Sequence, residues 1–171
     1  MQWQKAKEIL KEMFTQRGYT EISENGKTPL CAISTQGKVC VFLSTEKKMD
    51  NKELEEKIAS LKSEGSKHGI VVYREPPTRN AVEHIGEYEK IGYHLELFNV
   101  EDLQYNITHH YLVPKHTLLN PRDTLEFKRK FGVKIPALLR TDPVCKFYDF
   151  PKGGIVRVER KSGCAGYRIV R

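Results

Sequence analysis

The distribution of apolar residues changes at about residue 104, and this change constrains the fold more than any other feature of the chain. Up to that point, segments with apolar residues at helical spacing alternate with short apolar runs typical of strands. Beyond it, proline, glycine and β-branched residues dominate, and helical spacing recurs once. A chain of 171 residues suffices for two small domains. We therefore predict two domains, 1–104 and 105–171.

The charge is divided at the same place. Residues 1–104 hold 15 lysines and arginines against 17 acidic residues, whereas residues 105–171 hold 14 against 5. The net charge of +7 therefore comes from the second segment. A basic surface of this kind attracts an acidic partner. Nucleic acid and an acidic protein surface both fit, and charge does not choose between them.

The first segment predicts three helices and four strands. Asp50 and Glu53 are spaced as a capping box, and Pro76-Pro77-Thr78 opens a further helix. The predicted helices cover residues 2–16, 50–65 and 76–92, and the predicted strands cover residues 30–33, 39–43, 69–73 and 93–98. The first two strands read as a hairpin around a turn at 34–38. This order predicts an α/β (α+β) fold, a small mixed sheet flanked by helices, and it also occurs in restriction-endonuclease-like folds.

The second segment predicts a small, mostly β domain with one helix. The helix begins at Asn120-Pro121 and stops at Gly132. Strands are expected over 144–150 and 155–159, on either side of a turn at 152–154.

Three histidines lie close together in the stretch HHYLVPKH, and they raise the question of a metal or acid/base site. A zinc-binding helix places two histidines four residues apart on one face. His109 and His110 are adjacent instead, and Pro114 breaks any helix before His116. We predict that these histidines hold no metal.

A nuclease is a second enzymatic alternative, because it shares the element order of the first segment. Metal-dependent cleavage needs carboxylates on the central strands. Strands 30–33, 39–43 and 69–73 hold none, and Glu96 stands alone on the last strand. The four cysteines are scattered without a CxxC pair, so reduced thiols are expected. We predict no catalytic residue, no metal and no cofactor.

The stretch REPPTRN at 74–80 is a stiff turn that leads into a helix. The beginning of a helix can meet a phosphate through its free backbone N–H groups, and Arg79 would lie in the first turn. A plain connection between strand and helix explains the same residues, and the sequence leaves both interpretations open.

The second segment resembles a known family. Residues 106–116, NITHHYLVPKH, are similar to the NITxHxLVPxH segment of the fifth subunit shared by the eukaryotic nuclear RNA polymerases, a family with an archaeal counterpart. Asp142-Pro143-Val144, residues 152–162 and the pair Ala165-Gly166 with residues 167–170 resemble its later motifs in the same order. In the first segment, Arg17-Gly18-Tyr19 matches the family's RGY, and Pro76-Pro77-Thr78-Arg79 falls where eukaryotic members carry a Thr-Pro loop near downstream DNA.

The resemblance implies a non-catalytic subunit of a DNA-directed RNA polymerase. Residues 1–104 would form a restriction-endonuclease-like jaw lobe, with Pro77, Thr78 and Arg79 near downstream duplex DNA. Residues 105–171 would form an assembly module on the largest subunit and its neighbours, with Pro114 fixing a bend. Its expected interface residues are Leu112 and Val113 as buried anchors, Pro114, His116, Asp142, Pro143, Val144, Gly154, Arg160, Gly166, Tyr167 and Arg168.

This resemblance also bears on location and on the main alternative. The expected location is the nucleus, or a cytoplasmic viral factory or virion, because compact versions resemble subunits of large DNA viruses. No membrane contact is expected, since no apolar run approaches 18 residues. The alternative is a free-standing basic protein that binds nucleic acid directly.

Overall fold

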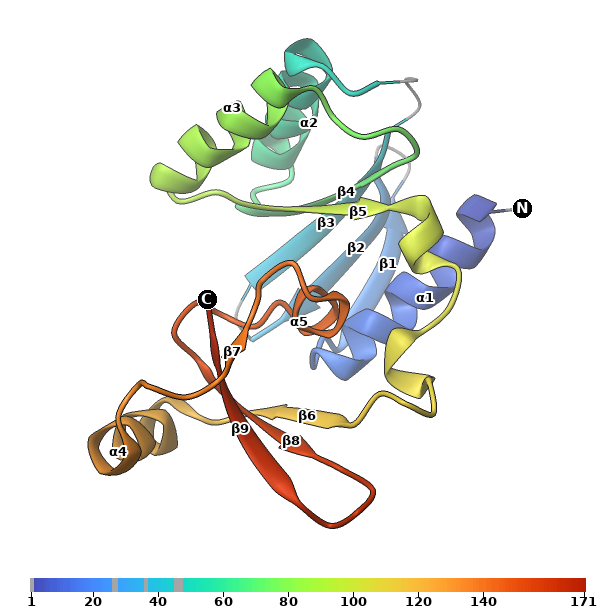
Figure 1. Cartoon of the computed structure of the whole chain (residues 1–171). Coiled ribbons are helices and arrows are strands. Elements are labelled where there is room, and N and C mark those ends of the chain that lie inside the picture. The colour runs from blue at the N-terminus through green and yellow to red at the C-terminus, as the bar shows by residue number, and fades with distance from the viewer. Residues whose placement is uncertain (1, 26–27, 36, 45–47) are drawn as a thin grey trace. The chain divides into compact units, whose positions relative to one another are not determined.

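The computed structural model describes residues 2–25, 28–35, 37–44 and 48–171. They form two compact units, unit 1 (Met1–Tyr105) and unit 2 (Asn106–Arg171), each with its own sheet (Figure 1). Among the described residues, no helix combines the length and the apolar character that a membrane span requires.

Unit 1 contains three α-helices, five strands and a 3-10 helix among its described residues. They are α1 Gln2–Gln16, β1 Glu21–Asn25, β2 Thr28–Ser34, β3 Gly37–Leu43, α2 Asn51–Ser63, β4 His68–Tyr73, α3 Arg79–Lys90, β5 His94–Asn99 and η1 Val100–Leu103. The predicted helices and hairpin are confirmed, although Gln36 of the predicted turn lies outside the described residues. The prediction of four strands was wrong, because β1 was missed: its sequence EISEN has one apolar residue.

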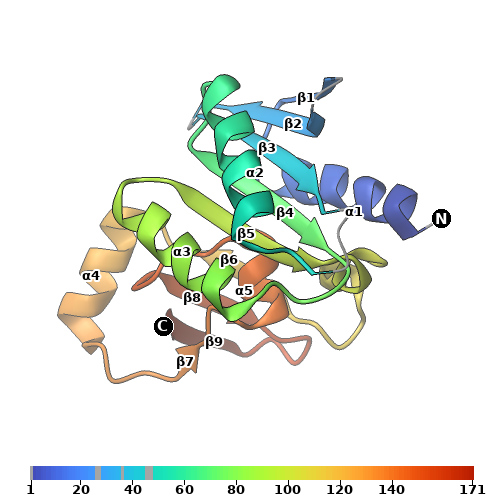
Figure 2. The same ribbon diagram turned by 90° about the horizontal axis from the view of Figure 1, so that it is seen from above.

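The sheet of unit 1 is mixed, as predicted. Its strand order is β1-β2-β3-β4-β5, with antiparallel pairing from β1 to β3 and parallel pairing from β3 to β5. Helices α2 and α3 lie over one face and α1 lies against the other (Figures 1 and 2). Parallel strands need such crossover helices to connect them.

The core of unit 1 follows from this layering. On the side of α2 and α3, buried apolar side chains of both helices meet alternate residues of the strands. This cluster includes Cys31, Cys40, Phe42, Leu54, Ile58, Leu61, Val71, Ala81, Ile85 and Leu95. The buried side chains of α1 are Ala6, Ile9, Leu10, Met13 and Phe14. Full burial of each large apolar side chain in this core contributes roughly 1.5–3 kcal/mol to the stability of the fold.

Unit 2 is built on a four-stranded sheet with the order β6-β8-β9-β7. Its elements are η2 Ile107–His109, β6 Lys115–Leu118, α4 Pro121–Phe131, β7 Ala137–Leu138, α5 Pro143–Tyr148, β8 Ile155–Glu159 and β9 Ala165–Val170. Strand β8 pairs antiparallel with β6 and β9, and β7 joins β9 in parallel. The predicted helix at α4 is confirmed, with Asn120 as its N-cap and Gly132 at its end.

Two predictions for this unit were wrong: that it contains a single helix, and that residues 144–150 form a strand. Residues Pro143–Tyr148 form α5 instead. The Asp142 carboxylate accepts the N–H groups of Val144 (2.9 Å) and Cys145 (3.3 Å), and Pro143 occupies the first turn. An aspartate cap followed by proline is a strong helix start, and here it outweighs the β propensity of the apolar residues that follow.

The two helices of unit 2 pack on opposite faces of its sheet. The register places His116, Val156, Val158, Arg168 and Val170 on one face, which we call the α5 face. Cys145 and Phe150 join Val156, Val158 and Val170 in one buried cluster, so α5 covers part of this face. Helix α4 packs on the other face, where the Phe127 ring lies 4.7 Å from the ring of Tyr167.

Candidate nucleic-acid and subunit interfaces

The turn between β4 and α3 is fixed by two hydrogen bonds of Thr78. The Thr78 N–H donates to the carbonyl of Met49 (3.0 Å), whose side chain is fully buried. The Thr78 hydroxyl accepts the N–H of Ala81 (3.2 Å) and so caps α3. Thr78 therefore has a structural role in fixing this turn, and Pro77 beside it is half-buried.

Arg79 is the most exposed of the three residues predicted to lie near DNA. Its Nε donates to Glu83 Oε1 at 3.0 Å, and the two side chains are 91% and 62% exposed. Ion pairs this exposed contribute about 0–1 kcal/mol, so a phosphate could replace Glu83 at small cost. The geometry permits contact with an anion at this turn.

Glu96, the acidic residue on β5, is bound by the side chains of Arg17 and His68. Arg17 donates through both terminal nitrogens to the two oxygens of Glu96, each at 2.7 Å, and His68 Nε2 lies 2.7 Å from Glu96 Oε1. Burial by itself would raise the pKa of Glu96, but the charge and hydrogen bonds of Arg17, with that of His68, outweigh it and lower the pKa to about 2. This carboxylate serves to join α1 and β5.

A second group in unit 1 was missed by sequence reasoning. Cys31 and Cys40 are directly opposite on β2 and β3, with their sulfurs 3.1 Å apart, and Glu64 lies close enough to complete a set of three possible metal ligands. Glu64 is already paired with Lys38 at 2.6 Å. Burial and the hydrogen bond with Cys31 raise the pKa of Cys40 to about 12, which disfavours the thiolate that binds metals. The signal available in the sequence was the register of the predicted hairpin, which places Cys31 opposite Cys40.

Five of the twelve predicted interface residues of unit 2 meet around one hollow. We call it the arginine hollow: it measures about 410 Å³, and its walls include Pro114, His116, Asp142, Val158, Arg160 and Arg168. Five of these six were predicted interface residues, and they come from four separate segments of the chain. The α5 face explains the convergence, because it carries His116, Val158 and Arg168, and Arg160 continues it past the end of β8.

The segment that leads to the hollow is shaped by local hydrogen bonds. Asn106 Oδ1 accepts the N–H of Thr108 (3.0 Å), which caps the short helix η2. His116 Nδ1 lies 2.8 Å from the Pro114 carbonyl oxygen. Within this chain Leu112 is 69% exposed and Val113 is half-buried, so Leu112 is not buried by the fold itself and its role as an anchor in an interface stays a prediction. Leu112 lies in the turn between η2 and β6.

The remaining predicted residues are dispersed. Val144 and Gly154 are buried within the fold, and Pro143 is exposed at the start of α5. Gly166 is exposed on the α5 face opposite Val158, whereas Tyr167 is on the other face beside α4. These five therefore do not form one surface.

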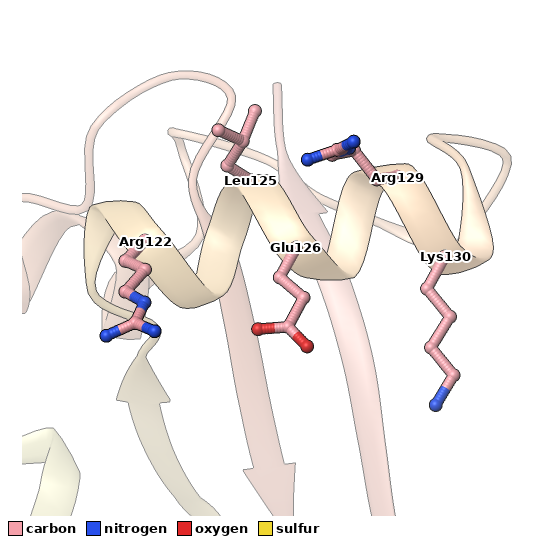
Figure 3. A pocket seen from close by; sticks show the side chains of 5 residues that line it. All are labelled: Arg122, Leu125, Glu126, Arg129 and Lys130. Carbon is pink, nitrogen blue, oxygen red and sulfur yellow. The ribbon is translucent and has the colours of Figure 1, made fainter.

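Helix α4 presents an additional charged surface that sequence reasoning did not select. Arg122, Glu126 and Lys130 point to one side of the helix, and Leu125 and Arg129 point to another (Figure 3). Leu125 is 61% exposed despite its apolar side chain. The i, i+4 spacing of these residues on an exposed helix was the available signal.

Comparison with known proteins identifies the family. The model of the family "RNA polymerase Rpb5, C-terminal domain" matches residues 105–170. The chain is 31% identical over 137 residues to the "DNA-directed RNA polymerases I, II, and III subunit rpabc1" of Dictyostelium discoideum, an alignment that covers 77% of this chain and 68% of the relative. It is 26% identical to the "Putative DNA-directed RNA polymerase subunit 454R" of Invertebrate iridescent virus 6, over 98% of both chains. The Caenorhabditis elegans subunit RPABC1 is 28% identical, over 76% of this chain and 64% of the relative.

These relatives confirm the resemblance predicted from the sequence. The match to the viral protein spans both units, whereas the family model covers unit 2 alone. The chain belongs to the Rpb5 family, the non-catalytic accessory subunits of DNA-directed RNA polymerases.

Proposed function

We propose that unit 2 docks this protein on the largest subunit of its polymerase and on neighbouring subunits, while the turn before α3 contacts downstream duplex DNA. The observation that carries the docking proposal is the convergence of Pro114, His116, Asp142, Arg160 and Arg168 around the arginine hollow. These residues lie within the segment that the family model matches.

The proposed DNA contact is with phosphate and independent of base sequence. One arginine on a turn lacks the paired donors and acceptors needed to read base edges. Arg79 is 91% exposed and its partner Glu83 is exposed as well, which supports a contact with an anion. The rigid turn, with Thr78 capping α3, would limit the entropy lost when Arg79 binds.

Affinity purification of the native protein tests the docking proposal. Recovery of the two large polymerase subunits with the tagged full chain is the expected result. Failure to recover them from cells in which the polymerase is active would overturn it.

Crosslinking in the assembled polymerase tests the DNA contact. Arg79→Ala should reduce crosslinks from unit 1 to downstream DNA and leave subunit recovery unchanged. Lys90→Ala is the matched control, because Lys90 is an exposed cation at the other end of α3. Equal crosslinking in the Arg79→Ala and wild-type complexes would show that the contact lies elsewhere.

The division of charge favours a second candidate, a free-standing protein that binds nucleic acid through unit 2. It is supported by the 14 basic residues against 5 acidic ones in residues 105–171. The place of action in either case would be the nucleus, or a viral factory or virion if the protein is viral. Imaging of the tagged protein together with the large polymerase subunits tests this.

A further inference from the structure

We propose that the arginine hollow receives a segment of a polymerase subunit in which an apolar side chain stands next to an aspartate or glutamate. This inference rests on the proposed docking function and names the chemistry that unit 2 would recognise. The apolar side chain would fill the floor of the hollow, and the carboxylate would pair with Arg160 and Arg168.

The floor of the hollow is apolar. Leu138 and Val158 both line the hollow and are only 5% and 6% exposed, and Pro114 adds a further apolar side chain to its lining. Gly166 is opposite Val158 in the β8–β9 register, and a Cβ added there would meet no atom within 4 Å. The surface over Gly166 is therefore open. A volume of about 410 Å³ admits one or two side chains.

The hollow is lined by two arginines, Arg160 and Arg168, against one carboxylate, that of Asp142. Over the part of the chain that the structure describes, neither Arg160 nor Arg168 forms an ion pair. Arg168 Nη1 donates to the carbonyl of Ala137 at 3.2 Å, which orients the guanidinium while its other nitrogens remain available. The Asp142 carboxylate keeps its charge while its Oδ1 accepts the N–H groups of Val144 and Cys145, so Arg160 and Arg168 together leave an excess of one positive charge in the hollow.

Two guanidinium groups beside an apolar floor favour a protein carboxylate over a phosphate backbone. Arginine is enriched in the centre of protein interfaces, where its planar group binds a carboxylate through two hydrogen bonds. A phosphate contact needs no apolar surface beneath it, whereas an acidic segment with an apolar neighbour uses both parts of the hollow. The excess of basic residues in unit 2 would attract such a segment.

Charge reversal on the two faces of β8 tests this inference in the full chain. Arg160→Glu reverses a charge on the α5 face, and Arg157→Glu makes the same change on the opposite face of the strand, where Arg157 is exposed and pairs with Glu159. We expect Arg160→Glu to lower recovery of the largest subunit by about thirtyfold or more, as loss of a central charge pair does. Arg157→Glu should stay within about twofold of wild type, and both variants should give the wild-type circular dichroism spectrum.

Overlapping 15-residue peptides of the largest subunit provide the second measurement, with the immobilised full chain as receptor. Peptides that bind should contain an apolar residue beside an acidic one, and replacing that acid by its amide should abolish binding. A 20-base-pair duplex should not compete with them. Three outcomes would overturn this inference and leave the proposed docking function standing. They are competition by the duplex, equal losses in the two charge-reversal variants, and normal recovery with Arg160→Glu. No recovery by the wild-type chain would overturn the proposed docking function as well.

Discussion

Arg17 and Glu96 lie 79 residues apart in the chain and are joined by two parallel hydrogen bonds of 2.7 Å. Their side chains are 5% and 9% exposed, so the pair is shielded from water. Arg17 follows the end of α1, where Gly18 has a φ of 85° and the Tyr19 ring packs at 5.3 Å from that of Phe14. The RGY motif thus ends the first helix and ties it to the last strand of the sheet.

Glu96→Gln should destabilise unit 1 by about 3–5 kcal/mol at pH 7, because it removes one partner of a buried charge pair. The pKa of Glu96 is about 2 in the folded protein, below its ordinary value of 4.5. Its contribution is therefore complete above pH 4.5 and is lost as the pH falls through about 2. The stability gap between wild type and Glu96→Gln should shrink by about 2–3 kcal/mol between pH 7 and pH 2.5. Urea unfolding monitored by Trp3 fluorescence measures it.

Comparison with an exposed ion pair controls for general effects of charge. Glu83→Gln, on the exposed Arg79–Glu83 pair, should change stability by about 0–1 kcal/mol at either pH. A gap for Glu96→Gln that is constant with pH would contradict the lowered pKa.

Gly154→Ala should destabilise unit 2 by about 1–3 kcal/mol, because the new methyl group has no room. A Cβ at Gly154 would lie 2.9 Å from Leu118 Cδ1 and 3.0 Å from the Pro151 carbonyl oxygen. Gly166→Ala is the matched control, since a Cβ there meets nothing within 4 Å and should change stability by about 0.5 kcal/mol or less. Urea unfolding followed by far-ultraviolet circular dichroism compares the two. A larger loss for Gly166→Ala would show that the packing around β8 and β9 differs from this description.

Local signals predicted most of the helices. Asp50 and Thr78 act as N-caps through the hydrogen bonds that their sequence contexts indicate, and Asn120 caps α4 through Asp123. Capping depends on residues within three positions, so it can be read from the sequence alone. Helix α5 departs from the predicted strand for a related reason: its apolar residues fit a strand, but the Asp142 cap and Pro143 start a helix there.

The contacts that could not be predicted from the sequence join residues that are far apart in the chain. Nothing in the neighbourhood of Glu96 indicates that Arg17 binds it, because the contact depends on how α1 packs on the sheet. The arginine hollow likewise arises from the register of β8 with β6 and β9, which places His116 and Arg168 on one face, next to Arg160 just past the end of β8. The family motif marked these residues, and the strand register supplies the physical reason for their proximity.

Thiol reactivity should separate Cys164 from the other three cysteines. Cys164 is exposed, whereas Cys31, Cys40 and Cys145 are buried. Burial raises the pKa of Cys40 to about 12 and that of Cys145 to about 11, so both remain protonated at pH 8. Only the thiolate attacks a disulfide reagent. We expect Ellman's reagent to modify one thiol rapidly in the native chain and all four after unfolding in urea. Cys164→Ser should remove the rapid phase, and a second rapid thiol would contradict the burial.

The isolated chain should bind duplex DNA weakly and with a shallow dependence on salt. The proposed DNA contact rests on Arg79, so the logarithm of the binding constant should fall against that of salt concentration with a slope near −1. Arg79→Ala should reduce this slope toward zero. A free-standing protein that uses the basic side chains of unit 2 would make many phosphate contacts and lose about a thousandfold or more in affinity between 50 and 200 mM salt. Fluorescence anisotropy with a labelled 20-base-pair duplex distinguishes the two, because a steep slope that survives Arg79→Ala would locate the DNA contacts outside the turn before α3 and favour the free-standing protein.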